Sequence, residues 1–131
     1  MRQRFRRKQD QAVTAVRLAL DFESFGYTKW GDSQHAKPGD WLVDNDGDVY
    51  TVAADSFAST YRQTGPGRWL KSTPVWAERA VEAGSVATKE GRTHHETGDW
   101  LVSNGEDGSD SYAISADKFE TMYEPDPDEG I

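Results

Sequence analysis

The sequence predicts a β-rich α+β protein made of two tandem small units, each a β-roll or barrel-like sheet of about five antiparallel strands followed by a short helix. Two observations carry this prediction. The pentapeptide GDWLV occurs at residues 39–43 and again at 98–102, and more residues match when the chain is aligned on it. After each copy, apolar and polar residues alternate, as in a strand with one buried face.

The alignment defines the expected organisation of the chain. It matches Tyr50 with Tyr112, and the pattern D-x-F-x-x-x-Y at 55–61 with the same pattern at 117–123. Repeat 1 then covers residues 12–62 and repeat 2 covers residues 74–124. Because 131 residues make up one domain's worth of chain, we expect the repeats to pack together. We expect a basic flexible arm at 1–11, a linker at 63–73 and an acidic disordered tail at 125–131.

Each repeat is expected to begin with a strand and a hairpin. The segment WAERAVEAG alone would fit a helix, but Pro74 and the spacing V-x-A-x-R, which both repeats share, favour a strand. The segments TKWGDSQ and TKEGRTH that follow predict one hairpin in each repeat.

A second hairpin is expected at GDWLV in repeat 1. The dipeptide Asp-Gly at 46–47 favours a two-residue type I′ turn, because both residues tolerate positive φ. Pairing across this turn sets Val43 opposite Tyr50 and Trp41 opposite Val52, so that the four apolar side chains share one face.

The corresponding stretch of repeat 2 is two residues longer. An insertion of two keeps the alternation of faces, whereas an insertion of one would reverse it. We therefore expect Val102 opposite Tyr112 and Trp100 opposite Ile114, with a longer loop at the tip.

A short helix is expected after each hairpin. Asp55 and Asp117 are placed as the N-cap residues, and an aromatic pair at i, i+4 spacing follows each of them. The predicted core comprises Trp41, Val43, Tyr50, Phe57, Tyr61, Trp100, Val102, Tyr112, Phe119 and Tyr123.

The motif PGDW at 38–41, with its hairpin and F-x-x-x-Y helix, resembles the PGDYG-type small proteins of bacteria and bacteriophages. Tryptophan replaces the tyrosine of that motif in both repeats, leucine replaces its last glycine, and Thr97 replaces the proline in repeat 2. The resemblance implies a fold unit, present here in two divergent tandem copies, and implies no catalytic residues.

The charge of the chain is unevenly distributed. The net charge is −8, yet residues 1–8 carry five cations and no acid, so that residues 9–131 carry −13. An acidic body repels nucleic acid and anionic membranes. The arm could bind nucleic acid or fold back on the acidic body, and both readings stay open. Its candidate binding residues are Arg2, Arg4, Arg6, Arg7 and Lys8.

Composition also bears on location. There is no cysteine, and no apolar run approaches the roughly 18 residues that span a bilayer. The basic start continues into polar QDQ rather than the apolar segment of a signal peptide. We expect a soluble cytoplasmic protein that is not bound to a membrane.

The acidic stretch at 44–48 is a weak candidate for metal binding. Asp44, Asp46 and Asp48 are spaced as in a calcium-binding loop, with Asp55 at the twelfth position. The turn-making glycine of such loops is replaced by Val49, and no long helix precedes the stretch. A solvated hairpin tip is the favoured interpretation, and we expect no metal and no cofactor.

Other polar residues are also interpreted structurally. His94, His95 and Glu96 fit a polar strand better than a metal site, since no second histidine-rich segment exists. Asp40 and Asp99 follow glycine at the start of a strand, where a carboxylate accepts hydrogen bonds from backbone N–H groups of the turn. No nucleophile–base motif is present, and we expect no enzyme.

Three tryptophans, Trp30, Trp69 and Trp76, have no tryptophan counterpart in the other repeat. They are candidates for contacting a partner or, for Trp69 and Trp76, for covering the junction between repeats. The leading hypothesis is a non-catalytic protein-binding or adaptor module of a bacterium or phage. The alternatives are an acidic nucleic-acid mimic that inhibits a basic nucleic-acid-binding protein, and nucleic-acid binding through the arm. Oligomeric state stays open.

Overall fold

The computed structural model describes residues 2–127. These residues form short β-strands and two α-helices of seven residues each. In chain order the elements are β1 (Gln3–Arg7), β2 (Val13–Arg17), β3 (Phe25–Lys29), β4 (Asp32–Ala36), β5 (Trp41–Asn45), β6 (Asp48–Val52), α1 (Ala54–Thr60), β7 (Tyr61–Gly65), β8 (Arg68–Lys71), β9 (Val75–Arg79), β10 (Gly84–Ala87), β11 (Arg92–His95), β12 (Trp100–Ser103), β13 (Ser111–Ile114), α2 (Ala116–Met122) and β14 (Tyr123–Pro125).

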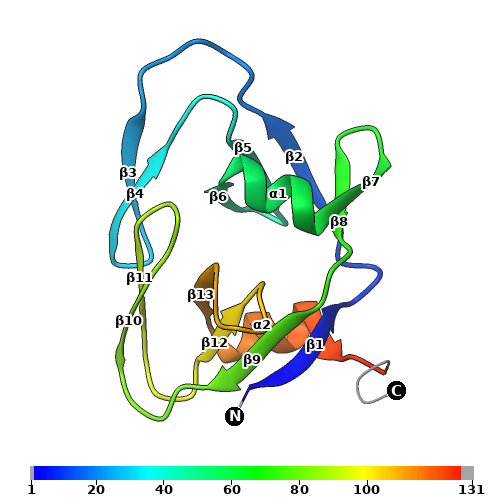
Figure 1. Ribbon diagram of the computed structural model, residues 1–131, viewed down its shortest axis with the longest axis vertical. Coiled ribbons are helices and arrows are strands. Elements are labelled where there is room, and N and C mark those ends of the chain that lie inside the picture. The colour runs from blue at the N-terminus through cyan, green and yellow to red at the C-terminus, as the bar shows by residue number, and fades with distance from the viewer. Residues whose placement is uncertain (1, 128–131) are drawn as a thin grey trace.

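The strands form two five-stranded antiparallel sheets and two separate hairpins. Sheet one has the order β6-β5-β2-β8-β7, and sheet two has the order β13-β12-β9-β1-β14. Figure 1 shows sheet one with α1 above sheet two with α2, while hairpins β3–β4 and β10–β11 lie together at one side. Within residues 2–127 neither sheet closes into a barrel. The fold is β-rich α+β, as predicted, but its sheets are open.

The hairpins at GDWLV have the predicted registers. Val43 pairs with Tyr50 and Trp41 with Val52 in β5–β6, and the turn residues Asp46 and Gly47 both have positive φ. In β12–β13 the longer loop leaves the pairs Trp100–Ile114 and Val102–Tyr112 intact. Alternation of side chains was therefore sufficient to place these strands.

The predicted helix caps are wrong. Helix α1 is capped at Ala53 and α2 at Ser115, so that Asp55 and Asp117 lie inside their helices. Neither cap residue makes a side-chain capping bond. In α1 the bond comes from the GDW turn instead, because Asp40 Oδ1 accepts the Ala54 N–H at 3.2 Å. A distant carboxylate thus satisfies one of the unpaired donors of the first turn.

Each sheet packs an aromatic stack against its helix. In sheet one Phe57 lies between Trp41 and Tyr61, with ring centroids 4.0 and 4.4 Å apart. In sheet two Phe119 lies between Trp100 and Tyr123, at 4.3 and 5.0 Å. The ten residues of the predicted core all lie in or against these two clusters.

The N-terminal segment differs most from expectation. Residues 3–7 were expected in a flexible arm, but they form β1, which lies between β9 and β14 in sheet two. Phe5 is buried there against Trp100 and Phe119. The sequence QRFRR alternates between a face that buries Phe5 and Arg7 and a face that carries the half-buried Arg4 and Arg6.

The expected linker and tail also contribute strands. Residues 61–71 form hairpin β7–β8, and β8 lies in the interior of sheet one. The expected tail begins inside β14, where Pro125 pairs with Phe5, and residues 128–131 lie outside the described residues. Neither helix within residues 2–127 is both long enough and apolar enough to span a bilayer.

Because Phe5 fills the core of sheet two, the substitution Phe5→Ala is expected to lower the free energy of unfolding by about 3–5 kcal/mol. Urea denaturation followed by tryptophan fluorescence measures this. Arg62→Ala, on an exposed position of β7, is the control and should change stability by no more than about 0.5 kcal/mol. An equally small effect of Phe5→Ala would mean that residues 3–7 are dispensable for the fold.

Candidate functional site

A cavity of about 300 Å³ lies between sheet one and sheet two. Side chains of both sheets, of hairpin β10–β11 and of both helices line it. One part of its wall is a group of two cations and four phenols that we call the tyrosine–cation cluster. Its members are Arg7, Tyr50, Tyr61, Lys71, Tyr112 and Tyr123.

Strand register brings the two cations of the cluster to the junction of the sheets. Arg7 is the last residue of β1 and pairs with Tyr123 on β14. Lys71 is the last residue of β8 and pairs with Tyr61 on β7. Each cation therefore stands next to a tyrosine at the point where a helix gives way to a strand.

Hydrogen bonds link the cluster across the junction. Arg7 Nη2 donates to the hydroxyls of Tyr123 and Tyr61, at 3.1 and 3.3 Å. Lys71 Nζ donates to the Tyr112 hydroxyl at 3.2 Å. The Tyr112 and Tyr123 hydroxyls lie 3.0 Å apart, so a continuous chain of polar contacts joins Arg7 to Lys71.

Both cations are buried without a carboxylate partner in residues 2–127. Arg7 is 2% exposed and Lys71 is 5% exposed. The Arg7 guanidinium donates to one backbone carbonyl and to two phenols, and its Nε atom has no hydrogen-bond partner. Buried charges are usually paired, because removing an ion from water costs several kcal/mol.

The two cations perturb the nearest phenol. Burial by itself would raise the pKa of Tyr123, but the charges of Arg7 and Lys71 outweigh it and lower this pKa to about 7. The pKa values of Tyr50 and Tyr112 are raised, mainly by burial. Tyr123 is thus the phenol of the cluster that can exchange a proton near neutral pH.

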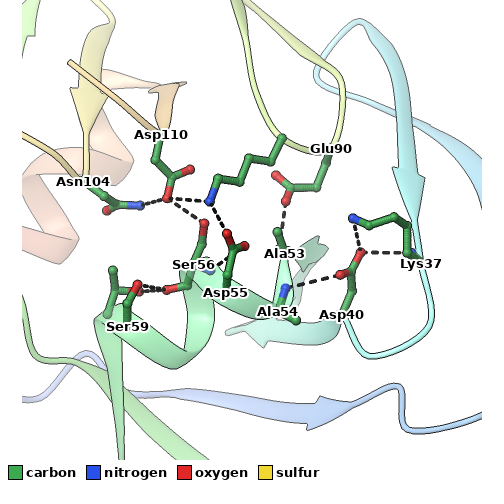
Figure 2. A network of polar contacts seen from close by, with 12 residues as sticks. Lys37, Asp40, Ala53, Ala54, Asp55, Ser56, Ser59, Glu90, Asn104 and Asp110 are labelled. Carbon is green, nitrogen blue, oxygen red and sulfur yellow. Dashed lines mark hydrogen bonds and ion pairs between the residues drawn. The ribbon is translucent and has the colours of Figure 1, made fainter. Parts of the chain in front are cut away.

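The carboxylates that line the cavity are engaged elsewhere. Figure 2 shows Asp110, whose Oδ2 accepts hydrogen bonds from Ser56 at 2.7 Å and Asn104 at 2.8 Å. Glu90 Oε2 accepts the Ala53 N–H at 2.8 Å, and burial raises the pKa of this carboxyl. These acids tie hairpin tips to α1 rather than neutralising the cluster.

Asp48, the first residue of β6, also lines the cavity. It forms ion pairs with Lys29 at 2.7 Å and with Lys118 of α2 at 2.6 Å. Desolvation opposes ionisation of Asp48, but the two lysines outweigh it and lower the pKa of the carboxyl. A third acid of the cavity wall is therefore already paired.

The predicted arm residues lie on or next to β1, an interior strand of sheet two. Arg2 pairs with Glu78 at 3.4 Å, Arg4 with Asp126 at 2.7 Å and Arg6 with Glu124 at 2.6 Å. Lys8 Nζ donates to the Glu120 carbonyl oxygen at 2.8 Å. Of the five predicted residues, Arg7 is the one that the structure brings into the cavity.

The three unmatched tryptophans have separate positions. Trp30 lies at the tip of hairpin β3–β4, contacts the Tyr50 ring at 5.5 Å between centroids and lines the cavity. Trp69 packs edge-on against Trp41 and Phe57 in the core of sheet one. Trp76 is half-buried on β9, opposite Arg4.

The weak metal candidates do not converge. Asp44 accepts the Gly47 N–H in the hairpin turn, whereas Asp48 pairs with lysines. His94 Nε2 lies 3.3 Å from Asp32 Oδ2. Across residues 2–127 no group of three or more histidine, aspartate or glutamate side chains is arranged to hold a metal ion.

The turn aspartates behave as predicted. Asp40 Oδ2 accepts the Lys37 N–H and Asp99 Oδ2 accepts the Glu96 N–H, each at 2.9 Å. In both GDW motifs the aspartate thus accepts a hydrogen bond from the backbone N–H three residues earlier in the chain.

Sequence reasoning missed the cluster as a site. Its four tyrosines were predicted as core residues, Arg7 as part of a nucleic-acid-binding arm, and Lys71 was not singled out. The available signal was a charged residue at an inward-facing position of a strand, next to an aromatic ring on the neighbouring strand. No family model, no curated protein and no solved structure matches the chain.

Tyr123 is expected to ionise with a midpoint near pH 7 in the folded protein. Tyrosinate absorbance at 295 nm measures this, and Tyr123→Phe should remove the transition while Tyr50→Phe should keep it. The unfolded phenol holds its proton up to about pH 10. Unfolding therefore takes up a proton between pH 7 and 10, and stability should rise with pH by at most about 1.4 kcal/mol per unit. A titration without a midpoint below pH 9 would contradict this assignment.

Proposed function

We propose that this chain is a non-catalytic binding module made of two copies of one unit, with its ligand bound in the cavity between the copies. The first strand of each repeat, β2 or β9, lies between a GDWLV hairpin and one further strand, β8 or β1. Lys71 and Arg7 occupy corresponding places on β8 and β1. Membership of the PGDYG-type proteins is proposed on the PGDW motif.

One observation carries the proposal: the cavity gathers a buried cation from each sheet, Arg7 of β1 and Lys71 of β8, neither with a carboxylate partner in residues 2–127. Ligand sites are typically concave, with an apolar lining and a few convergent polar groups, and their volumes begin near 300 Å³. Val52 and Ile114 supply apolar lining here, beside the tyrosine–cation cluster. The size supports a small ligand.

The hydroxyl groups of the lining favour binding over catalysis. Ser56 Oγ donates to Asp110, and Thr60 Oγ1 donates to the Ser56 carbonyl oxygen. Within residues 2–127 neither hydroxyl contacts a histidine or lysine that could activate it as a nucleophile. The Thr60 hydroxyl therefore stabilises α1, and the Ser56 hydroxyl links α1 to Asp110 of the other unit.

Native mass spectrometry of protein purified under non-denaturing conditions tests the proposal. Wild-type protein is expected to carry a bound small molecule, and Ala113→Phe, at a position that lines the cavity, is expected to lose it. Ala58→Phe on the exposed face of α1 is the matched control and should retain it. The same bound mass in all three proteins, or turnover of the bound molecule, would contradict a non-catalytic site in this cavity.

A second candidate, binding of a protein partner, is favoured by the outer face of sheet one. Val16, Leu42 and Val49 are 57%, 38% and 45% exposed, and Val16 lies directly opposite Leu42 on adjacent strands. The exposed Asp44 lies opposite Val49. We propose that this face accepts a partner whose apolar side chain is flanked by basic residues, in keeping with the net charge of −8.

For this second candidate, Leu42→Asp is expected to weaken capture of the partner at least about 10-fold. Val81→Asp, at an exposed valine outside the face, should leave capture unchanged. Binding is also expected to weaken as salt is raised. If the two variants behave alike, the outer face of sheet one is not the contact surface.

A further inference from the structure

The tyrosine–cation cluster has an excess of hydrogen-bond donors. Arg7 and Lys71 only donate, and each donates to phenol oxygens. One of the Tyr112 and Tyr123 hydroxyls donates to the other, which leaves one phenolic proton of that pair to be directed elsewhere. The Tyr61 hydroxyl already accepts from Arg7, so its own proton is also available to an acceptor.

Negative charge is missing from the same place. The two buried cations have no carboxylate partner in residues 2–127, and the acids of the cavity wall hold lysines or backbone and side-chain donors of their own. The Arg7 Nε atom is buried without any hydrogen-bond partner. Two buried cations without a carboxylate partner in residues 2–127, together with available phenolic protons, are complementary to an oxyanion.

We propose that the cavity binds a small molecule through one oxyanion group, a carboxylate or a phosphate, which Arg7 and Lys71 hold together with the hydroxyls of Tyr61, Tyr112 and Tyr123. Both cations lie near the Tyr61 ring, with Arg7 Cζ 5.9 Å and Lys71 Nζ 6.0 Å from its centroid, and the Tyr123 and Tyr112 hydroxyls link them. This inference rests on the proposed ligand-binding function and gives its ligand a chemical class.

The remaining volume indicates more than a bare ion. A cavity of about 300 Å³ is at the lower end for organic ligands. Trp30, Val52 and Ile114 line it beyond the cluster and suit an apolar part of the ligand. The ligand class is therefore a small organic acid or a small phosphate ester.

The Tyr123 phenolate can supply negative charge beside Arg7 and Lys71 in place of the ligand's oxyanion. Arg7 on β1 and Lys71 on β8 act on the Tyr123 phenol, Tyr112 on β13 is in hydrogen-bond contact, and Tyr50 is close enough to interact with it. With its pKa lowered to about 7, the phenol carries part of the missing negative charge when no oxyanion is bound. This substitute accounts for how two buried cations are tolerated in the empty protein.

Calorimetric titration of the full chain with sulfate, and separately with acetate, tests the proposal. We expect saturable binding of at least one anion, with chloride at equal ionic strength as the blank. Lys71→Met and Arg7→Gln should each weaken it by about 30-fold or more, and Lys71→Arg should restore most of it. Arg62→Gln removes an exposed cation from β7 and should leave binding unchanged.

The two anions distinguish the sources of the oxyanion. Preference for sulfate indicates a phosphate-bearing ligand, and preference for acetate indicates a carboxylic acid. Lys71→Met also guards against loss of folding, because removing an unpaired buried charge should raise the urea midpoint in anion-free buffer. Binding of neither anion, or equal binding by Lys71→Met and wild type, overturns the inference.

Failure of this inference can be separated from failure of the proposed function. If Ala113→Phe abolishes a co-purified mass but no anion binds at Lys71, the cavity is a ligand site for an uncharged or cationic molecule. If anions bind at Lys71 and Ala113→Phe has no effect on either readout, the cluster binds the anion outside the proposed cavity.

Discussion

The insertion of β1 between β9 and β14 is the constraint on which the rest of the structure depends. It makes the first strand of the chain an interior strand of sheet two, so that sheet two forms only after most of the chain is present. Phe5 then fills the second aromatic core. The same alternation that turns Phe5 inward turns Arg7 inward two residues later. A buried cation at the junction of the sheets is thus a direct consequence of how the N-terminus is built into the fold.

The junction is consequently held by polar contacts rather than by a continuous apolar core. The two hydrophobic clusters are separate, and between them lie Arg7, Lys71 and the phenols that they contact. Hairpin tips add ion pairs across the junction, such as Asp48 with Lys118. A polar junction leaves room for a cavity that an apolar core would fill, because buried charge resists close packing by hydrocarbon. If the proposed ligand binds there, the stability of the protein and its affinity for that ligand are coupled at Arg7 and Lys71.

The local parts of this structure could be predicted from the sequence, and the site could not. The registers of Val43 with Tyr50 and of Val102 with Tyr112 follow from alternation over a few residues and from turn chemistry. By contrast, QRFRR has one apolar residue, and its charge density is typical of a solvated arm. Its place in sheet two depends on pairing with two strands that are distant in the chain, β9 and β14. The Asp55 cap was misplaced because Asp40 Oδ1, in an earlier turn, accepts the hydrogen bond from the Ala54 N–H at the start of α1. Alternation within single strands does not reveal that Arg7 of β1 and Lys71 of β8 both line the cavity between the sheets.

We propose that the two buried cations Arg7 and Lys71 share an oxyanion in the cavity. A crystal structure of the full chain grown with selenate, with anomalous data collected at the selenium edge, tests it most directly. We expect an anomalous peak in the cavity, with selenate oxygens within hydrogen-bond distance of Lys71 Nζ and the Arg7 guanidinium and the phenols of Tyr112 and Tyr123 as further neighbours. A cavity without a peak, in which a carboxylate of the chain pairs with Lys71 or Arg7 instead, would contradict it.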